Sequence, residues 1–205
     1  MVGVDHPVHE RANIPPVQQI FAFNELAIAV RHWFEIGPDD DEHGARLEIR
    51  RLVRHPHRGS ESAPQLLELD EIVWRADLFD VVGDAPGSWS RAHHHADFDG
   101  IEPTGRTWDD ELSADPLGWT RRRLEDLPGL LTACGVELED SEGEAADVRR
   151  ALPAIMAALE ACRPEACGSP EECLAATRDT REITQIMLGM FRADDPRDPR
   201  LVRSP

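Results

Sequence analysis

The sequence predicts an α+β fold, with an N-terminal antiparallel sheet of about four strands followed by a C-terminal helical region of about three to four helices. Runs of β-branched and aromatic residues fill the first half of the chain. Apolar residues at helical spacing fill the second half, without the strand–helix–strand alternation of a doubly wound sheet. We therefore expect a flexible lead over 1–16, an antiparallel β domain over 17–112, a helical region over 113–192 and a disordered tail over 193–205.

Several runs in the first half indicate strands. Residues 25–36 are rich in β-branched and aromatic side chains and end at 37–41, which has the composition of a turn. Polar and apolar residues alternate over 46–53, which predicts a strand with one largely polar face. The run 66–82 is followed by a Gly- and Pro-containing loop and then by 88–95, which predicts a hairpin with a longer loop.

The first helix of the second half is expected to begin at Asp115. This residue has the character of an N-cap, and Pro116 occupies the first helical position. The helix should be interrupted near Pro128 and end at 134–135, where Gly135 follows Cys134.

Two further helices are expected. Apolar residues share one face over 145–162, where Pro153 is the weak point. A serine cap, a proline and a glutamate three residues after the cap form a capping box at 169–172, which predicts a helix reaching about Phe191.

The charge of the chain argues against nucleic-acid binding. The net charge is -18, all 22 basic residues are Arg, and the Arg121, Arg122 and Arg123 run is too short to overcome the acidic field. We therefore expect no nucleic-acid partner. Adaptation to high salt is a separate explanation of the acidity, and the sequence leaves it open.

The sequence also gives an expected location. No apolar run approaches the ~20 residues that span a bilayer, and residues 1–16 carry acid and prolines where a signal peptide would be apolar. We expect a cytoplasmic protein with no membrane partner. Its four cysteines, Cys134, Cys162, Cys167 and Cys173, should then be thiols.

The strongest candidate site is a histidine and aspartate cluster at the end of the expected hairpin. The two-residue period of a strand would place His93 and His95 on one face and His94 on the other. Two imidazoles on one face can share a divalent ion, and Asp97 or Asp99 in the following loop would supply oxygen. We therefore expect His93, His95, Asp97 and Asp99 to hold zinc, manganese, nickel or iron.

The preceding strand is expected to supply groups that bind a substrate. If the hairpin pairs in register, Arg75 and Asp77 stand beside Arg91 and His93 on one polar face. Arg75 and Arg91 would then hold an anionic substrate group, and Asp77, the third residue expected to bind the substrate, would take part in acid–base chemistry. The alternative, which stays open, is that these side chains form a solvated sheet face with no ligand.

The cysteine segment resembles part of a known family. Cys162, Cys167 and the Glu-Cys-Leu stretch at Cys173 resemble the cysteine region of the WhiB-type iron–sulfur regulators. That resemblance implies an iron–sulfur cluster and a DNA-binding tail. The chain departs from the family in its wider Cys162–Cys167 spacing, in residues 185–189, where the family has a glycine–tryptophan turn, and in lacking a basic tail. We therefore expect buried thiols and no iron–sulfur cluster.

A second resemblance covers most of the chain. The Arg-Ala-Asp-Leu-Phe motif at 75–79, the stretch 93–100 and the helix 173–191 are similar to an uncharacterised actinobacterial family of unknown function. This resemblance implies no activity.

Three functional hypotheses follow. The leading one is a small metal- or ligand-binding α+β protein. If this protein is an enzyme, we expect a metal-dependent, hydrolase-like activity. The alternative is a non-catalytic interaction or oligomerisation protein that docks a partner or second copy through the stripe of Ile183, Ile186, Met187 and Met190. The second alternative is an iron–sulfur or thiol-based sensor.

Overall fold

The fold consists of one antiparallel sheet and a layer of helices. The computed structural model describes residues 18–35, 40–57, 59, 65–85 and 87–162. Within these residues a five-stranded sheet in the order β1-β2-β3-β4-β5 is followed by four helices. The predicted α+β class is therefore confirmed. The expected lead over 1–16, helix over 169–191 and tail over 193–205 lie outside the described residues.

The main sheet is a meander in which each strand pairs antiparallel with the next. Its strands are β1 (Gln18–Ala22), β2 (Leu26–Glu35), β3 (Glu42–Arg54), β4 (Leu67–Val81) and β5 (His93–His95). The first of these, β1, was not expected from the sequence. Two short strands, β6 (Phe98–Asp99) and β7 (Glu102–Pro103), form a separate hairpin. The chain then returns beside β5, where Thr107 pairs with His94.

Each helix begins with an aspartate cap. The helices are α1 (Asp110–Ala114), α2 (Pro116–Glu125), α3 (Leu127–Ala133) and α4 (Ser141–Ala161). Asp115 caps α2 as expected, because its side chain accepts a hydrogen bond from the Gly118 backbone N–H. The interruption expected near Pro128 occurs at Asp126, which caps α3. None of the helices in the described part of the chain is long and apolar enough to cross a membrane.

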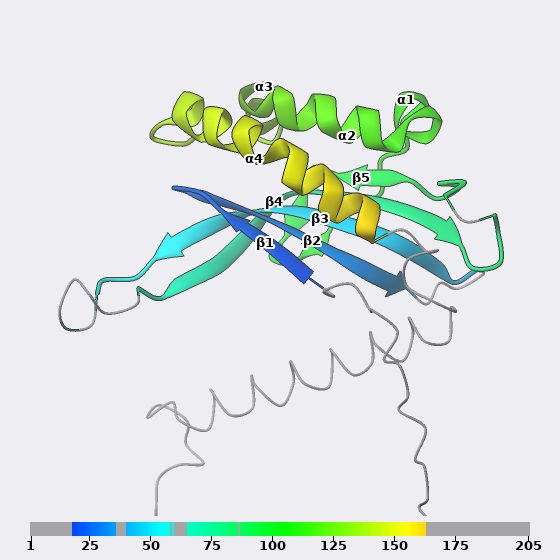
Figure 1. The fold of residues 1–205 in the computed structure, drawn as a ribbon, viewed down its shortest axis with the longest axis horizontal. Coiled ribbons are helices and arrows are strands. Elements are labelled where there is room, and N and C mark those ends of the chain that lie inside the picture. The colour runs from blue at the N-terminus through cyan, green and yellow to red at the C-terminus, as the bar shows by residue number, and fades with distance from the viewer. Residues whose placement is uncertain (1–17, 36–39, 58, 60–64, 86, 163–205) are drawn as a thin grey trace, which may run out of the picture.

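All four helices lie on one face of the sheet, so the two faces have different chemistry (Figure 1). The inner face contributes Ile28, Leu47 and Trp74 to a core shared with helix residues such as Leu124 and Ile155. Because strand residues alternate between faces, the polar residues between these apolar ones point away from the helices. These residues, which we call the polar face, include Arg46, Glu48, Arg75, Asp77, His93 and His95.

The helical layer is tied to the sheet by a buried carboxylate. Glu144 of α4 is 2% exposed, and its carboxylate accepts the backbone N–H groups of Asn24, Glu25 and Leu26 at 2.7–3.2 Å. The Glu25 side chain in turn accepts the backbone N–H of Glu139 at 3.0 Å. These hydrogen bonds join the β1–β2 turn to the start of α4 and satisfy donors that would otherwise be left unpaired.

Candidate metal site

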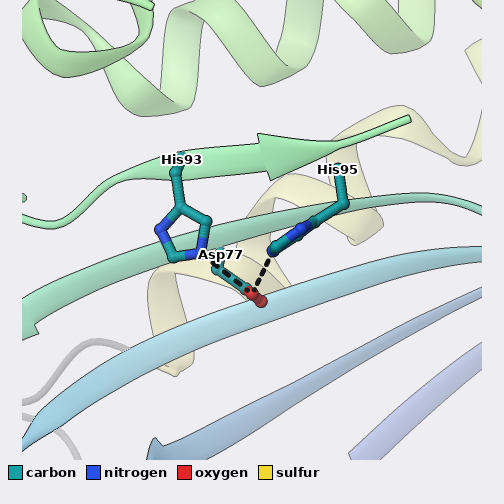
Figure 2. Close-up of side chains that lie close together, drawn as sticks. All are labelled: Asp77, His93 and His95. Atoms are coloured by element: carbon teal, nitrogen blue, oxygen red, sulfur yellow. Dashed lines mark hydrogen bonds and ion pairs between the residues drawn. The ribbon is translucent and has the colours of Figure 1, made fainter. Parts of the chain in front are cut away.

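The pairing of β4 with β5 builds the site. Asp77 lies opposite His93, and Arg75 lies opposite His95. The four side chains therefore share the polar face. Figure 2 shows His93 and His95 pointing from β5 toward the carboxylate of Asp77 on β4. Asp77, His93 and His95 are buried, with exposed fractions of 0%, 1% and 2%.

The ligand atoms of these residues are spaced as they would be around one metal ion. Asp77 Oδ2 lies 3.5 Å from His93 Nε2 and 3.3 Å from His95 Nε2. One ligand atom from each residue lies within 4.8 Å of the other two. Bonds of about 2.0–2.2 Å to a common ion would place neighbouring ligand atoms about 3.0–3.6 Å apart. The group could therefore hold a metal ion after small adjustments.

Backbone carbonyls fix the orientation of both imidazole rings. His93 Nδ1 lies 2.7 Å from the carbonyl oxygen of Arg91, and His95 Nδ1 lies 2.5 Å from that of Gly105. A carbonyl oxygen only accepts hydrogen bonds, so each Nδ1 carries the proton and donates it. In the neutral ring Nε2 then keeps its lone pair. Both lone pairs face Asp77, the orientation that metal-binding histidines require.

The charge states of the group suit metal binding at neutral pH. Burial lowers the pKa of His93 to about 4, although the charge of Asp77 acts in the opposite direction. The ring is therefore neutral at pH 7, the form that binds metal. Burial pushes the pKa of Asp77 upward, but the charge of Arg46, its hydrogen bonds and the charge of Arg75 hold that pKa well below its usual range. Asp77 is a carboxylate under the same conditions.

Two arginines already contact these ligands. Arg46 donates to both oxygens of Asp77, from Nε at 2.6 Å and from Nη2 at 3.0 Å. Arg75 has its Nε 3.1 Å from Asp77 Oδ2 and its Nη2 3.0 Å from His95 Nε2. Because His95 Nε2 is the acceptor in that contact, Arg75 uses the lone pair that a metal ion would use. Without metal the group is a buried ion-pair network.

Aromatic side chains pack around the two histidines. The His93 ring lies 5.1 Å from Trp108 and 6.1 Å, edge-on, from Phe79. The His95 ring lies 6.3 Å from Phe98. These apolar neighbours restrict the rotamers of the rings and keep the surroundings poorly solvated.

The structure separates the residues that the sequence proposed as metal ligands. His93 and His95 lie together on the polar face, whereas Asp97 and Asp99 are exposed and do not belong to the group of convergent ligand atoms. The charge of Asp97 acts on Cys134, whose pKa is raised by burial and by that carboxylate. His94 points to the helical face, where its ring lies 5.2 Å from Trp119.

The residues proposed to bind a substrate are also divided. Arg75 and Asp77 join the two histidines, but the Arg91 guanidinium lies 2.8 Å from Asp40 and 3.7 Å from Glu42. Arg91 contributes to the site through its backbone carbonyl. Sequence reasoning did not identify Asp77 as a metal ligand or Arg46 as its main partner. The alternation of residues along β4 places Asp77 on the polar face, but only the strand register places it opposite His93.

The sensor and interaction hypotheses concern residues that are mostly outside the described part of the chain. Cys167, Cys173 and the stripe of Ile183, Ile186, Met187 and Met190 all lie there. Cys162 is buried, and burial raises its pKa to about 11. A thiol with that pKa is protonated at neutral pH, and the thiolate is the form that binds iron.

The chain was also compared with known proteins. No family model, no curated protein and no solved structure matches it. A function for this chain is therefore inferred from the geometry of Asp77, His93 and His95.

Proposed function

We propose that the chain binds one divalent transition-metal ion through Asp77, His93 and His95. The observation that carries the proposal is the convergence of two Nε2 atoms on Asp77 Oδ2, at 3.3 and 3.5 Å. Zinc, manganese, nickel and iron(II) are the candidate ions, because imidazole and carboxylate ligands suit all of them.

The ligand set favours a reactive site over a closed structural one. Two imidazoles and one carboxylate leave coordination positions free, whereas structural zinc sites take four protein ligands. Two histidines and one carboxylate also occur in hydrolytic zinc enzymes and in non-haem iron enzymes. We therefore assign the chain to metal-dependent chemistry, with hydrolysis as the leading reaction class.

Metal binding is compatible with the Arg46 hydrogen bond to Asp77 Oδ1 but competes with the contacts of Arg75. Asp77 has two oxygens, so Arg46 can keep its 2.6 Å hydrogen bond to Oδ1 while Oδ2 binds the ion. Arg75 must give up its 3.0 Å contact with His95 Nε2. That hydrogen bond competes with the metal for His95 Nε2 and therefore lowers the metal affinity.

Calorimetry on the untagged, EDTA-treated protein tests the proposal. We expect one equivalent of zinc, manganese, nickel or iron(II) to bind, with iron(II) handled without oxygen. The Asp77→Asn, His93→Ala and His95→Ala variants should each weaken binding by roughly tenfold or more. His94→Ala is the matched control, because it removes the intervening imidazole from the opposite face.

The aspartates of the following loop supply a second comparison. Asp97→Asn and Asp99→Asn should bind metal like the wild type, since both residues are exposed and lie outside the convergent group. Equal losses in all three histidine variants, or saturable binding by none of the four metals, would contradict the proposal. Circular dichroism of each variant separates a lost ligand from a lost fold.

A further inference from the structure

Arg75 is the poorly compensated cation of the polar face. The other guanidiniums described there have glutamate partners: Arg31 and Arg50 pair with Glu48, Arg46 with Glu35, and Arg106 with Glu35 and Glu42. Arg75 shares Asp77 with Arg46 and has no other carboxylate within ion-pair distance among the described residues. Its buried Nε atom makes no hydrogen bond within the described structure.

Metal binding at the proposed site would remove both contacts of Arg75. The ion would take Asp77 Oδ2, which lies 3.1 Å from Arg75 Nε, and His95 Nε2, which lies 3.0 Å from Arg75 Nη2. Arg75 is only 8% exposed, so water cannot fully replace these partners. A buried charge left without a partner is strongly unfavourable, and the guanidinium would require a new acceptor.

The metal-loaded site would also carry an excess of positive charge. A divalent ion would stand beside the guanidiniums of Arg46 and Arg75. The carboxylates paired with these two arginines are Asp77, which contacts both, and Glu35, which contacts Arg46, so positive charge would exceed negative charge. The open metal positions and the freed guanidinium would lie next to each other, because both use His95 Nε2 and Asp77 Oδ2. A guanidinium presents parallel N–H groups that match the paired oxygens of a carboxylate or phosphate.

We infer that the metal-loaded site binds a small oxyanion, a carboxylate or a phosphate, with one oxygen on the metal and another on Arg75. This inference rests on the proposed metal site and names the chemical class of its ligand. Arg75 thus has two states: it donates to His95 when metal is absent and to the oxyanion when metal is bound. The metal creates the oxyanion site by releasing the arginine.

Cobalt(II), whose visible absorption reports its ligands, allows a direct test. The cobalt-loaded wild type is titrated with sodium acetate and, separately, with inorganic phosphate at constant ionic strength. We expect a saturable spectral change with at least one of the two anions. Saturation by acetate identifies a carboxylate ligand, and saturation by phosphate identifies a phosphate ligand.

Variants of Arg75 separate this inference from the metal site itself. Arg75→Gln should bind cobalt at least as tightly as the wild type, because a competing donor is gone, but its oxyanion affinity should fall roughly tenfold or more. Arg75→Lys should retain part of that affinity. Arg50→Gln is the matched control, since Arg50 lies on the same face and pairs with Glu48; it should behave like the wild type.

The outcomes distinguish the two claims. If the wild type binds cobalt but neither anion, or if Arg75→Gln binds the anion as well as the wild type does, the oxyanion inference is overturned and the metal site stands. If the wild type binds no cobalt, the metal proposal fails and the inference fails with it. If Arg75→Gln does not fold, the wild type provides the test. An anion that binds the metal-loaded site must raise the cobalt affinity of the wild type above its value in chloride. No tightening overturns the inference.

Discussion

Asp77 of β4 lies directly opposite His93 of β5, and its Oδ2 atom is 3.5 Å from His93 Nε2. The two side chains are 0% and 1% exposed. Directly paired residues of antiparallel strands point to the same face, so strand register alone brings this carboxylate to this imidazole. The stability of the sheet and the geometry of the candidate metal site therefore depend on the same residues.

The buried pair of Arg46 and Asp77 should dominate the stability of the polar face. We expect Arg46→Met to lower the free energy of unfolding by about 3 kcal/mol or more, because a buried carboxylate loses its bidentate partner. The two side chains are 5% and 0% exposed. Urea denaturation at pH 7 measures the change.

Arg50→Met is the control for that measurement. The Arg50 side chain is 19% exposed and lies on the same strand and face. Its loss should cost about 1 kcal/mol or less. If both variants lose the same free energy of unfolding, the Arg46–Asp77 pair does not dominate the stability of the polar face.

The stability of the metal-free protein should decrease between neutral pH and pH 4.5. Burial lowers the pKa of His93 to about 4, below the 6.5 of an exposed imidazole. The unfolded state therefore takes up the proton first as the pH falls, and stability present above about pH 6.5 is lost toward pH 4. The full loss corresponds to roughly 3 kcal/mol.

Urea midpoints in EDTA at pH 7 and pH 4.5 measure this effect in the wild type and in His93→Gln. The variant lacks the titrating ring, so its midpoint should change less between the two pH values. The titration of Asp77 does not contribute to this difference. Because the pKa of Asp77 is held below its usual range, protonation of this carboxyl lowers the stability only below about pH 4. The same pH dependence in both proteins would contradict the assignment to His93.

Local patterns were sufficient to predict much of the fold. The alternation of polar and apolar residues over 46–53 predicted a strand with one polar face, and the structure confirms it as part of β3. That alternation holds through Arg50 and ends at Arg51, and the pairing with β4 shifts register in the same stretch, between Ile49 and Leu52. β1 was missed because Gln18–Ala22 is a short edge strand with a half-exposed pattern, and five residues are too few to show a clear alternation.

The site could be predicted only in part. A two-residue period is enough to propose that His93 and His95 share a face. The choice of Asp77 as their partner depends on the register between β4 and β5, which the sequence of the connecting loop does not determine. Asp80 shapes that loop, because its carboxylate accepts hydrogen bonds from Gly87 and Ser88 at 2.7 and 2.9 Å. These contacts are visible only in the folded chain.

Gly44 should tolerate no side chain. Its φ is +153°, and a Cβ atom there would lie 2.1 Å from the carbonyl oxygen of Leu78. We expect Gly44→Ala to destabilise the protein by at least about 2 kcal/mol, because β3 and β4 would have to separate next to the polar face. Thermal or urea unfolding measures the loss.

Gly105→Ala is the matched control for Gly44→Ala. A Cβ atom at Gly105 would meet nothing within 4 Å. The change should stay within about 0.5 kcal/mol. A similar cost at both glycines would show that the close approach of β3 and β4 does not restrict Gly44.

Diffraction at the zinc absorption edge from crystals of the zinc-loaded protein tests the metal site most directly. We predict one strong anomalous peak about 2.0–2.2 Å from Asp77 Oδ2, His93 Nε2 and His95 Nε2. The exposed pair of His55 and Glu68, whose Nε2 and Oε2 atoms lie 2.7 Å apart, is the natural place for adventitious zinc. Zinc at that pair or elsewhere, with no peak among Asp77, His93 and His95, would contradict the account.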